Sequence, residues 1–229
     1  LVGLFILTLS KDSKVLDTVM PKLTAAADRA GLVGAGGAGF PTARKLASMT
    51  GTRPGPVIVN GSEGESASGK DTILLAHVPH LVLDGAVAAA RALGTRQVLV
   101  RIPATRSHVI DMVAAAIEQR RDRDVRISVS PGPDTFIAGE ASAVISSLQG
   151  GPAQPVPLPK PPTMRTGLRT RPVLLSNVET FARLALAARG YTATSSLVTV
   201  SGAVVDAGVI EVDPGTPLGH VLRVAGADA

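Results

Sequence analysis

The chain has 229 residues, enough for one medium-sized domain and part of a second, and its 45% hydrophobic and 18% charged residues exclude an intrinsically disordered protein. Only 2% of the residues are aromatic and none is cysteine. The sequence therefore argues against nucleic-acid binding by base stacking, and it excludes disulfides, a thiol nucleophile and iron–sulfur ligation within these residues. The net charge of +5 is only weak support for an acidic partner.

The start of the chain, Leu1–Ser10, is an apolar run that is too short to span a bilayer and lacks the basic leader of a signal peptide. Charged residues, Pro or Gly interrupt every other apolar run before it reaches transmembrane length. We therefore expect a cytoplasmic protein without a transmembrane segment. From the missing initiating Met and the end at Ala229, we also expect these residues to be a fragment of a longer protein.

The first part of the chain alternates helical and strand patterns. Glycines and prolines mark the ends of the helices, and short apolar runs mark the strands. The expected elements are, in order, a helix over 15–30, a glycine-rich loop over 31–41, a helix over 42–49, a strand over 56–60, a polar loop over 61–71, a helix over 79–93, a strand over 97–102, a helix over 105–121 and a strand over 125–130. Such alternation predicts an α/β fold with a Rossmann-like parallel sheet and flanking helices.

The pattern changes in the second part of the chain. A helix over 139–148, a Pro-rich loop over 150–162 and a helix from Asn177 to Ala188 are expected, with Asn177 as the N-cap. A polar linker over 191–196 separates these from a tail. The tail has alternating patterns typical of two strands, over 197–204 and 209–212, and then a helix over 217–225.

Four glycines, Gly34, Gly36, Gly37 and Gly39, stand directly before the helix that contains Lys45. A backbone of this kind approaches a ligand closely and directs its N–H groups at an anion, usually a phosphate, to which Lys45 would add a positive charge. The loop is neither a Walker A loop nor a dinucleotide fingerprint, because it lacks Gly-Lys-Ser/Thr and follows a helix rather than a strand. A tightly packed turn without a ligand is the alternative.

Polar residues also follow the strand over 56–60, where α/β sheets place their ligands. Asn60 and Ser62 could bind a heterocycle, and Glu63 and Glu65 could accept hydrogen bonds from sugar hydroxyls. Solvated loop carboxylates are the alternative. Glu140, after Gly139 at a helix start, is either an acid that complements the helix dipole or a site residue. We expect the three segments to converge on one mononucleotide cavity.

Taken together, these segments resemble the flavin-carrying F subunit of respiratory complex I (NADH:quinone oxidoreductase) and its relatives in formate dehydrogenases and hydrogenases. The matching motifs are residues 31–45, Asn60-Gly-Ser-Glu-Gly-Glu65, Phe136-Ile-Ala-Gly-Glu140, Lys160-Pro-Pro162 and Ser176-Asn-Val-Glu-Thr180. The tail from Val198 is similar to the start of that family's β-grasp (ubiquitin-like) module, the SLBB domain. The resemblance implies an N-terminal segment (1–24), an FMN-binding α/β domain (25–192) and a partial β-grasp segment (197–229).

The resemblance implies FMN as the cofactor, with the redox chemistry carried by the flavin, no catalytic side chain and no metal ligand in this chain. The residues implied for FMN are Gly34, Gly36, Gly37, Gly39, Lys45, Asn60, Ser62, Glu63, Gly139, Glu140, Asn177 and Thr180. Those implied for NADH are Phe40, Glu65 and Lys160. The electron acceptor would be an iron–sulfur cluster outside these residues, in a partner subunit or in a C-terminal cluster domain, and partner subunits could hold the protein at the membrane periphery.

Several positions depart from the family's pattern on the NADH side. Ala141 stands where the family has a second Glu, and Thr163 and Leu46 replace aromatic residues. We therefore expect an oxidoreductase that relays electrons from NADH or another donor through FMN to an iron–sulfur acceptor. One alternative is a non-catalytic binding or assembly subunit with a decayed flavin/NADH pocket. The other is that the tail is a small-molecule-binding module. The second is disfavoured, because half a β-grasp would leave an open sheet edge.

Overall fold

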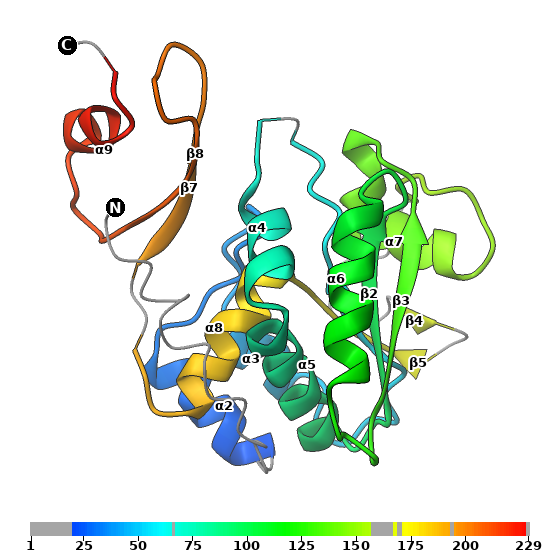
Figure 1. The fold of residues 1–229 in the computed structure, drawn as a ribbon. Helices are drawn as coiled ribbons and strands as arrows, with labels where there is room; N and C mark the ends of the chain where they lie inside the picture. Colours follow the sequence, from blue (N-terminus) through cyan, green and yellow to red (C-terminus); the bar gives the residue numbers. More distant parts are fainter. Residues whose placement is uncertain (1–19, 66, 157–166, 169–170, 193–194, 228–229) are drawn as a thin grey trace.

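A four-stranded parallel sheet forms the centre of the molecule (Figure 1). The computed structural model describes residues 20–65, 67–156, 167–168, 171–192 and 195–227. The strand order is β3-β2-β1-β6, and the strands are β1 (Val57–Asn60), β2 (Gln97–Pro103), β3 (Arg126–Gly132) and β6 (Leu174–Asn177). The predicted α/β fold with a parallel sheet and flanking helices is confirmed.

The two faces of the sheet pack against different helices, because side chains alternate along each strand. Val57 and Val59 face the main core, to which α2, α3, α4, α5, α6 and α8 contribute, whereas Ile58 packs with Val144 and Ile145 of α7. The helices are α2 (Met20–Arg29), α3 (Thr42–Ala47), α4 (Lys70–His77), α5 (Pro79–Leu93), α6 (Ser107–Glu118), α7 (Ala141–Leu148) and α8 (Val178–Ala188). Both layers are built almost entirely from aliphatic side chains, as the low aromatic content requires.

The helix ends lie close to where glycine and proline predict them. Gly31 and Gly94 follow α2 and α5 with φ angles of +57° and +71°, a conformation that favours glycine, and Pro79 begins α5. Asn177 caps α8 by accepting a hydrogen bond from the Glu179 N–H. The helix α2 continues across the expected domain boundary at 24/25, and its Leu23 is fully buried in the main core, so the described part of this helix belongs to the α/β domain.

Several elements are absent from the sequence-based prediction. The helix α4 begins inside the expected polar loop, and the edge strand β6 ends at Asn177. The structure also contains a two-stranded pair, β4 (Gly167–Leu168) with β5 (Arg171–Pro172), and a short helical turn, η2 (Phe136–Gly139). The strands and the helical turn are only two to four residues long, and the strands depend on their partner strands for hydrogen bonds, so local patterns do not reveal them.

The tail forms a small unit of its own. The strands β7 (Ser196–Val200) and β8 (Gly208–Val212) pair in antiparallel fashion, and α9 (Leu218–Val224) packs on them through Val221, as the alternating pattern predicted. The unit contacts the main domain, where the Gly69 N–H donates to Thr199 Oγ1 at 3.0 Å before α4. Its assignment as the start of a β-grasp module stays a prediction.

Among the described residues, no single helix is long and apolar enough to cross a membrane. Only α4 and α5 taken together reach that length and composition, and a bend of 94° separates them.

Candidate functional site

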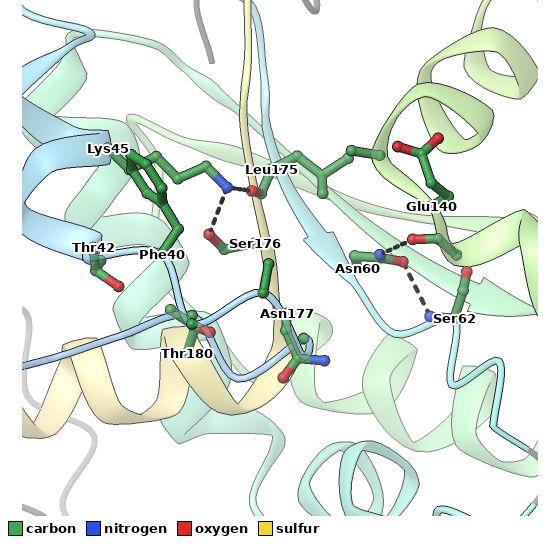
Figure 2. A pocket seen from close by; sticks show the side chains of 16 residues that line it. Phe40, Thr42, Lys45, Asn60, Ser62, Glu140, Leu175, Ser176, Asn177 and Thr180 are labelled. Atoms are coloured by element: carbon green, nitrogen blue, oxygen red, sulfur yellow. Dashed lines mark hydrogen bonds between the residues drawn. The ribbon is translucent and has the colours of Figure 1, made fainter. Parts of the chain in front are cut away.

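A cavity of about 360 Å³ opens at the carboxyl end of the sheet, beside the last residues of β1 and β6 (Figure 2). Asn60 and Asn177 occupy paired positions at the ends of these two parallel strands. Figure 2 shows Lys45 on one side of the cavity and Asn60 with Ser62 on the other. The lining residues are Gly34, Gly36, Ala38, Gly39, Phe40, Thr42, Lys45, Asn60, Ser62, Gly139, Glu140, Ala141, Leu175, Ser176, Asn177 and Thr180. The glycine-rich loop, the loop after β1 and the helix start at Glu140 therefore meet at one cavity, as predicted from the sequence.

The glycine-rich loop is closed at its base and attached to α8. The Gly34 N–H donates to the Phe40 carbonyl oxygen at 2.9 Å, and the Ala35 N–H donates to Thr180 Oγ1 at 3.0 Å. Gly37 and Gly39 have φ angles of +93° and +58°, which other residues adopt only with strain. Gly37 itself is not a wall residue of the cavity. The backbone of this loop therefore forms one wall of the cavity, and its hydrogen bond to α8 fixes its position.

Lys45 extends from α3 into the cavity wall and forms no ion pair with any residue that the structure describes. Its Nζ donates to the Leu175 carbonyl oxygen and, at 3.4 Å, to Ser176 Oγ. Burial lowers the pKa of Lys45 below its usual value, and no carboxylate in the part of the chain that the structure describes opposes this effect. A cation in such surroundings favours an anionic ligand.

The opposite side of the cavity consists of two segments in backbone contact. Asn60 Nδ2 donates to the Gly139 carbonyl oxygen at 2.8 Å, and the Ser62 N–H donates to Asn60 Oδ1 at 3.2 Å. A side chain at Gly139 would place its Cβ 2.8 Å from the Ser62 carbonyl oxygen, so glycine is required there. Glu140 is exposed and caps α7 by accepting from the Ser142 N–H at 2.8 Å, so it is both the N-cap and a wall residue.

Glu63 does not line this cavity, in contrast to the role that the sequence suggested for it. Its buried carboxylate accepts hydrogen bonds from the Asp71 and Thr72 N–H groups at 3.0 and 3.2 Å and pairs with Arg106 at 3.0 Å. Burial alone would raise the pKa of Glu63, but the hydrogen bonds from Ser68, Asp71 and Thr72 outweigh it and hold the pKa below its usual value. Glu63 therefore caps the unpredicted helix α4.

The residues suggested for NADH are divided among different places. Phe40 lines the main cavity and is 39% exposed. Glu65 lies in a second cavity of about 750 Å³, lined by Glu63, Gly64, Glu65, Ala67, Arg106, Asp134, Thr135 and Phe136. Lys160 and Thr163 lie outside the described residues.

Sequence reasoning missed several wall residues of the main cavity. Leu175 and Ser176 belong to β6, the strand that was not predicted, and Thr42 lies at the start of α3. The short apolar pair before Ser176 was the available signal for this strand. In the part of the chain that the structure describes, no group of three or more His, Asp or Glu side chains is arranged to hold a metal ion.

Residues 27–186 match the family described as the Nuo51 FMN-binding domain. The chain is 30% identical to the F subunit of the NADH-quinone oxidoreductase of Aquifex aeolicus, over 85% of this chain and 51% of that protein. It is also 30% identical to the NAD-reducing hydrogenase HoxS subunit alpha of Cupriavidus necator, over 96% of this chain and 39% of that protein. The crystal structure of an NAD⁺-reducing NiFe-hydrogenase in the air-oxidized state is similar with a TM-score of 0.86 and 29% identity, covering 97% of this chain and 43% of that chain. The chain thus spans about half, or less, of the length of these relatives.

Proposed function

The chain belongs to the Nuo51 FMN-binding domain family, and on this basis we propose that it holds FMN and relays electrons between a donor and an acceptor that lies outside these residues. FMN, when bound, supplies the transfer of electrons singly or in pairs. The residues of this chain bind and orient it, and none of them needs to act as an acid or a base.

The observation that carries the proposal is the cation Lys45 in the cavity wall, which forms no ion pair with any carboxylate of the described residues. FMN brings a phosphate group whose charge would pair with Lys45. The glycine-rich loop lets the backbone approach the ligand, and the cavity volume of about 360 Å³ falls within the range typical of small-molecule sites. The residues present therefore fit this cofactor.

We assign the cavity's other polar groups to the same ligand. Asn60, Ser62 and Glu140 lie across the cavity from Lys45 and would contact the ring and the ribityl chain. Thr180 holds the loop in place through Ala35. Glu63 is not part of this set, because its carboxylate is already occupied by α4 and Arg106.

For the electron donor, we propose a nicotinamide dinucleotide that extends from the main cavity toward the second one. Phe40 at the first cavity, and Glu65 with Phe136 at the second, offer two aromatic faces and a carboxylate for ribose hydroxyls. Phe136 is 74% exposed, so a stacking partner would cover apolar surface that is now in contact with water. The names of the relatives, which include NADH-quinone oxidoreductase and NAD-reducing hydrogenase, support this choice of donor.

The acceptor must lie elsewhere, since this chain contains no cysteine to hold an iron–sulfur cluster. We propose that a partner subunit, or a further domain of the same protein, supplies it. The relatives are named as subunits, which agrees with a role inside a larger assembly.

Flavin titration followed by anaerobic mixing with NADH tests these proposals in order. We expect the purified chain to bind FMN in a one-to-one complex, and we expect NADH to bleach the visible absorbance of the bound flavin. A chain that binds no FMN would contradict the proposed function as a whole. Bound FMN that NADH leaves oxidised, but that a chemical reductant bleaches, would contradict the assigned donor only.

A non-catalytic binding or assembly subunit is the second candidate, and Ala141 favours it. This residue lines the main cavity at the position where the resemblance places a nucleotide-contacting Glu. Binding of FMN without reduction by NADH, combined with stable association with a partner subunit, is the result expected for this alternative.

A further inference from the structure

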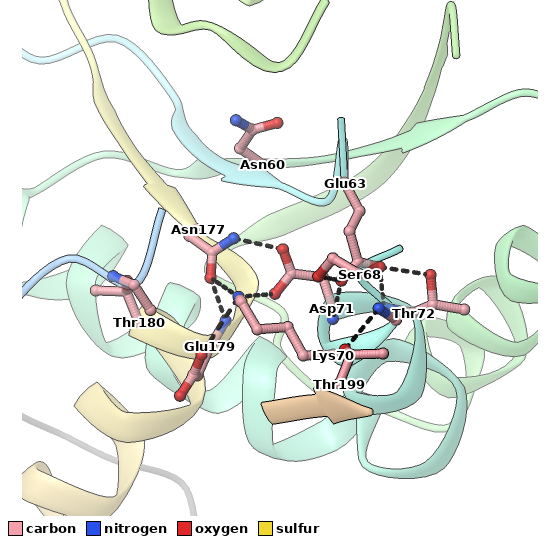
Figure 3. Close-up of polar contacts among 12 residues, drawn as sticks. Asn60, Glu63, Ser68, Lys70, Asp71, Thr72, Asn177, Glu179, Thr180 and Thr199 are labelled. Carbon is pink, nitrogen blue, oxygen red and sulfur yellow. Dashed lines mark hydrogen bonds and ion pairs between the residues drawn. The ribbon is translucent and has the colours of Figure 1, made fainter. Parts of the chain in front are cut away.

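Asn177, at the wall of the main cavity, has its side-chain amide held by residues of α4 and α8 (Figure 3). Its Nδ2 donates to Asp71 Oδ2, and its Oδ1 accepts from Lys70 Nζ and from the Glu179 N–H, both at 3.0 Å. Both groups that face Oδ1 are donors, and the group that faces Nδ2 is an acceptor. Only this orientation of the amide satisfies all three contacts.

The same amide is connected to the glycine-rich loop through the first turn of α8. Asn177 caps that turn, and Thr180 in the same turn accepts the hydrogen bond from the Ala35 N–H at 3.0 Å. A Cβ at Gly36 would lie 3.6 Å from Asn177 Cβ, so the loop and Asn177 are also close neighbours. Any change in how Asn177 is held would therefore reach the wall of the cavity.

We propose that Lys70 and Asp71 are positioning residues of the flavin cavity: ionised Asp71 fixes the Asn177 amide, and through it the start of α8 and the glycine-rich loop, in the arrangement that binds flavin. This inference rests on the proposed function. Neither residue lines the cavity, and both act through Asn177.

Charged groups from several elements surround Asp71. Lys70 lies 2.7 Å from Asp71 Oδ1, and Glu63, from the loop after β1, accepts from the Asp71 N–H. Glu179 of α8 pairs with Lys70 at 3.3 Å and with Arg183 at 2.7 Å, and Arg106 pairs with Glu63. Burial raises the pKa of Asp71 to about 6, because its effect and that of Glu63 outweigh the opposing effects of Lys70 and Asn177.

Protonation of Asp71 would disrupt this arrangement. The added proton makes one carboxyl oxygen a donor, although both oxygens face donors, Lys70 Nζ and Asn177 Nδ2. If the amide turned to accept the new proton, its Nδ2 would face Lys70 and the Glu179 N–H, and the cap of α8 would be lost. Flavin affinity should therefore fall as the pH falls through the pKa of Asp71.

The Asp71 carboxyl should affect the stability of the flavin-free chain in the opposite direction to its effect on flavin affinity. Its pKa of about 6 lies above the usual value of 3.8, so the folded state binds the proton more readily than the unfolded state. The contribution of Asp71 to stability therefore rises as the pH falls from about 7 toward about 4. A loss of flavin affinity without a loss of stability would separate positioning from acid unfolding.

The test is a flavin titration of the wild-type chain and of Asp71→Asn, followed by flavin fluorescence between about pH 7.5 and about pH 5. Riboflavin is the decisive probe and FMN the second one, because the phosphate of FMN itself has a pKa of about 6. Asp111→Asn, on the exposed surface of α6, is the matched control for the loss of a carboxylate. Thermal melting by circular dichroism accompanies each titration.

We expect the wild type and the control to lose about tenfold in riboflavin affinity on acidification, because about a tenth of Asp71 stays ionised one pH unit below its pKa. Asp71→Asn should bind at least about tenfold more weakly at the higher pH and show no pH step, since its side chain is neutral throughout. Wild-type affinity for Asp71→Asn, or an unchanged pH step in it, would overturn the inference.

If Asp71→Asn fails to fold, the pH dependence of riboflavin binding by the wild type tests the positioning role by itself. A wild-type riboflavin affinity that stays constant across the pH range would overturn the positioning role while leaving flavin binding intact. Absence of flavin binding by the wild type at every pH would instead overturn the proposed function, and this inference with it.

Discussion

Two partly buried lysines near Asn177 have very different surroundings: Lys45 lines the cavity together with Asn177, and Lys70 donates to Asn177 Oδ1. Lys70 contacts the carboxylates of Asp71 at 2.7 Å and Glu179 at 3.3 Å. Burial alone would lower the pKa of Lys70, but these two carboxylates outweigh it and raise the pKa above its usual value. Among the described residues, Lys45 has only a carbonyl and a hydroxyl oxygen as acceptors, and burial lowers its pKa.

This difference indicates that the charge of Lys70 stabilises the fold, whereas the charge of Lys45 is available to a ligand. The charge of Lys70 is balanced inside the protein, together with the Glu63–Arg106 pair of the same network. The charge of Lys45 has no such balance among the described residues. An uncompensated cation in a cavity wall is unfavourable for folding, so its counter-charge is best supplied from outside.

Removing the charge of Lys70 should have the largest effect, and this effect should be on the free energy of unfolding. Lys70→Met leaves Asp71 and Glu179 buried without their shared cation, so we expect the free energy of unfolding of the flavin-free chain to fall by about 3 kcal/mol. Urea unfolding measures this change. Lys22→Met, on the exposed side of α2, is the control and should leave the stability unchanged. Equal stabilities of the two variants would show that the network does not support the fold.

Removing the unbalanced charge should affect the ligand rather than the fold. We expect Lys45→Met to weaken FMN binding by about tenfold to a hundredfold, which corresponds to one lost hydrogen bond between charged groups, with no fall in the stability of the flavin-free chain. Flavin fluorescence titration and thermal melting provide the two measurements. Riboflavin, which lacks the phosphate, should be much less affected, and an equal loss for both flavins would mean that Lys45 does not bind the phosphate.

The smallest effect should come from the backbone of the loop itself. Gly37 has a φ of +93°, and no atom lies within 4 Å of the position that a Cβ would take there, so Gly37→Ala introduces conformational strain alone. We expect a loss of about 1 kcal/mol in stability and weaker FMN binding. Gly36→Ala is the matched control for the stability measurement, since its new Cβ would meet only Asn177 Cβ at 3.6 Å. If both variants lost the same stability, the left-handed conformation at Gly37 would not be the cause of the loss.

Much of the fold could be predicted because its signals are local. Gly31 and Gly94 end helices, Pro79 begins one, and Asn177 caps one, each for a reason that involves only its chain neighbours. The helix α4 and the strand β6 escaped prediction. The strand is four residues long and exists because β1 offers it hydrogen bonds, while α4 begins where Glu63 and Arg106 meet its first turn.

For the candidate site, the sequence indicated which loops would meet but not which way each side chain would turn. Asn60, Ser62 and Glu63 follow one strand, and all three looked equally suited to a ligand. The fold places the first two at the cavity and gives the third to the start of α4.

The sequence by itself therefore determined the parallel α/β architecture, the glycine positions of the loop and the family to which the chain belongs, because these depend on local backbone preferences and on residue order. Only the tertiary structure decided how the charges are divided. A buried carboxylate or ammonium group turns toward whichever partner the fold brings within hydrogen-bond distance, and that partner is usually distant in the sequence. Lys70 has carboxylate partners of this kind, whereas Lys45 has none among the described residues, which is why the cavity has a place for an anionic cofactor.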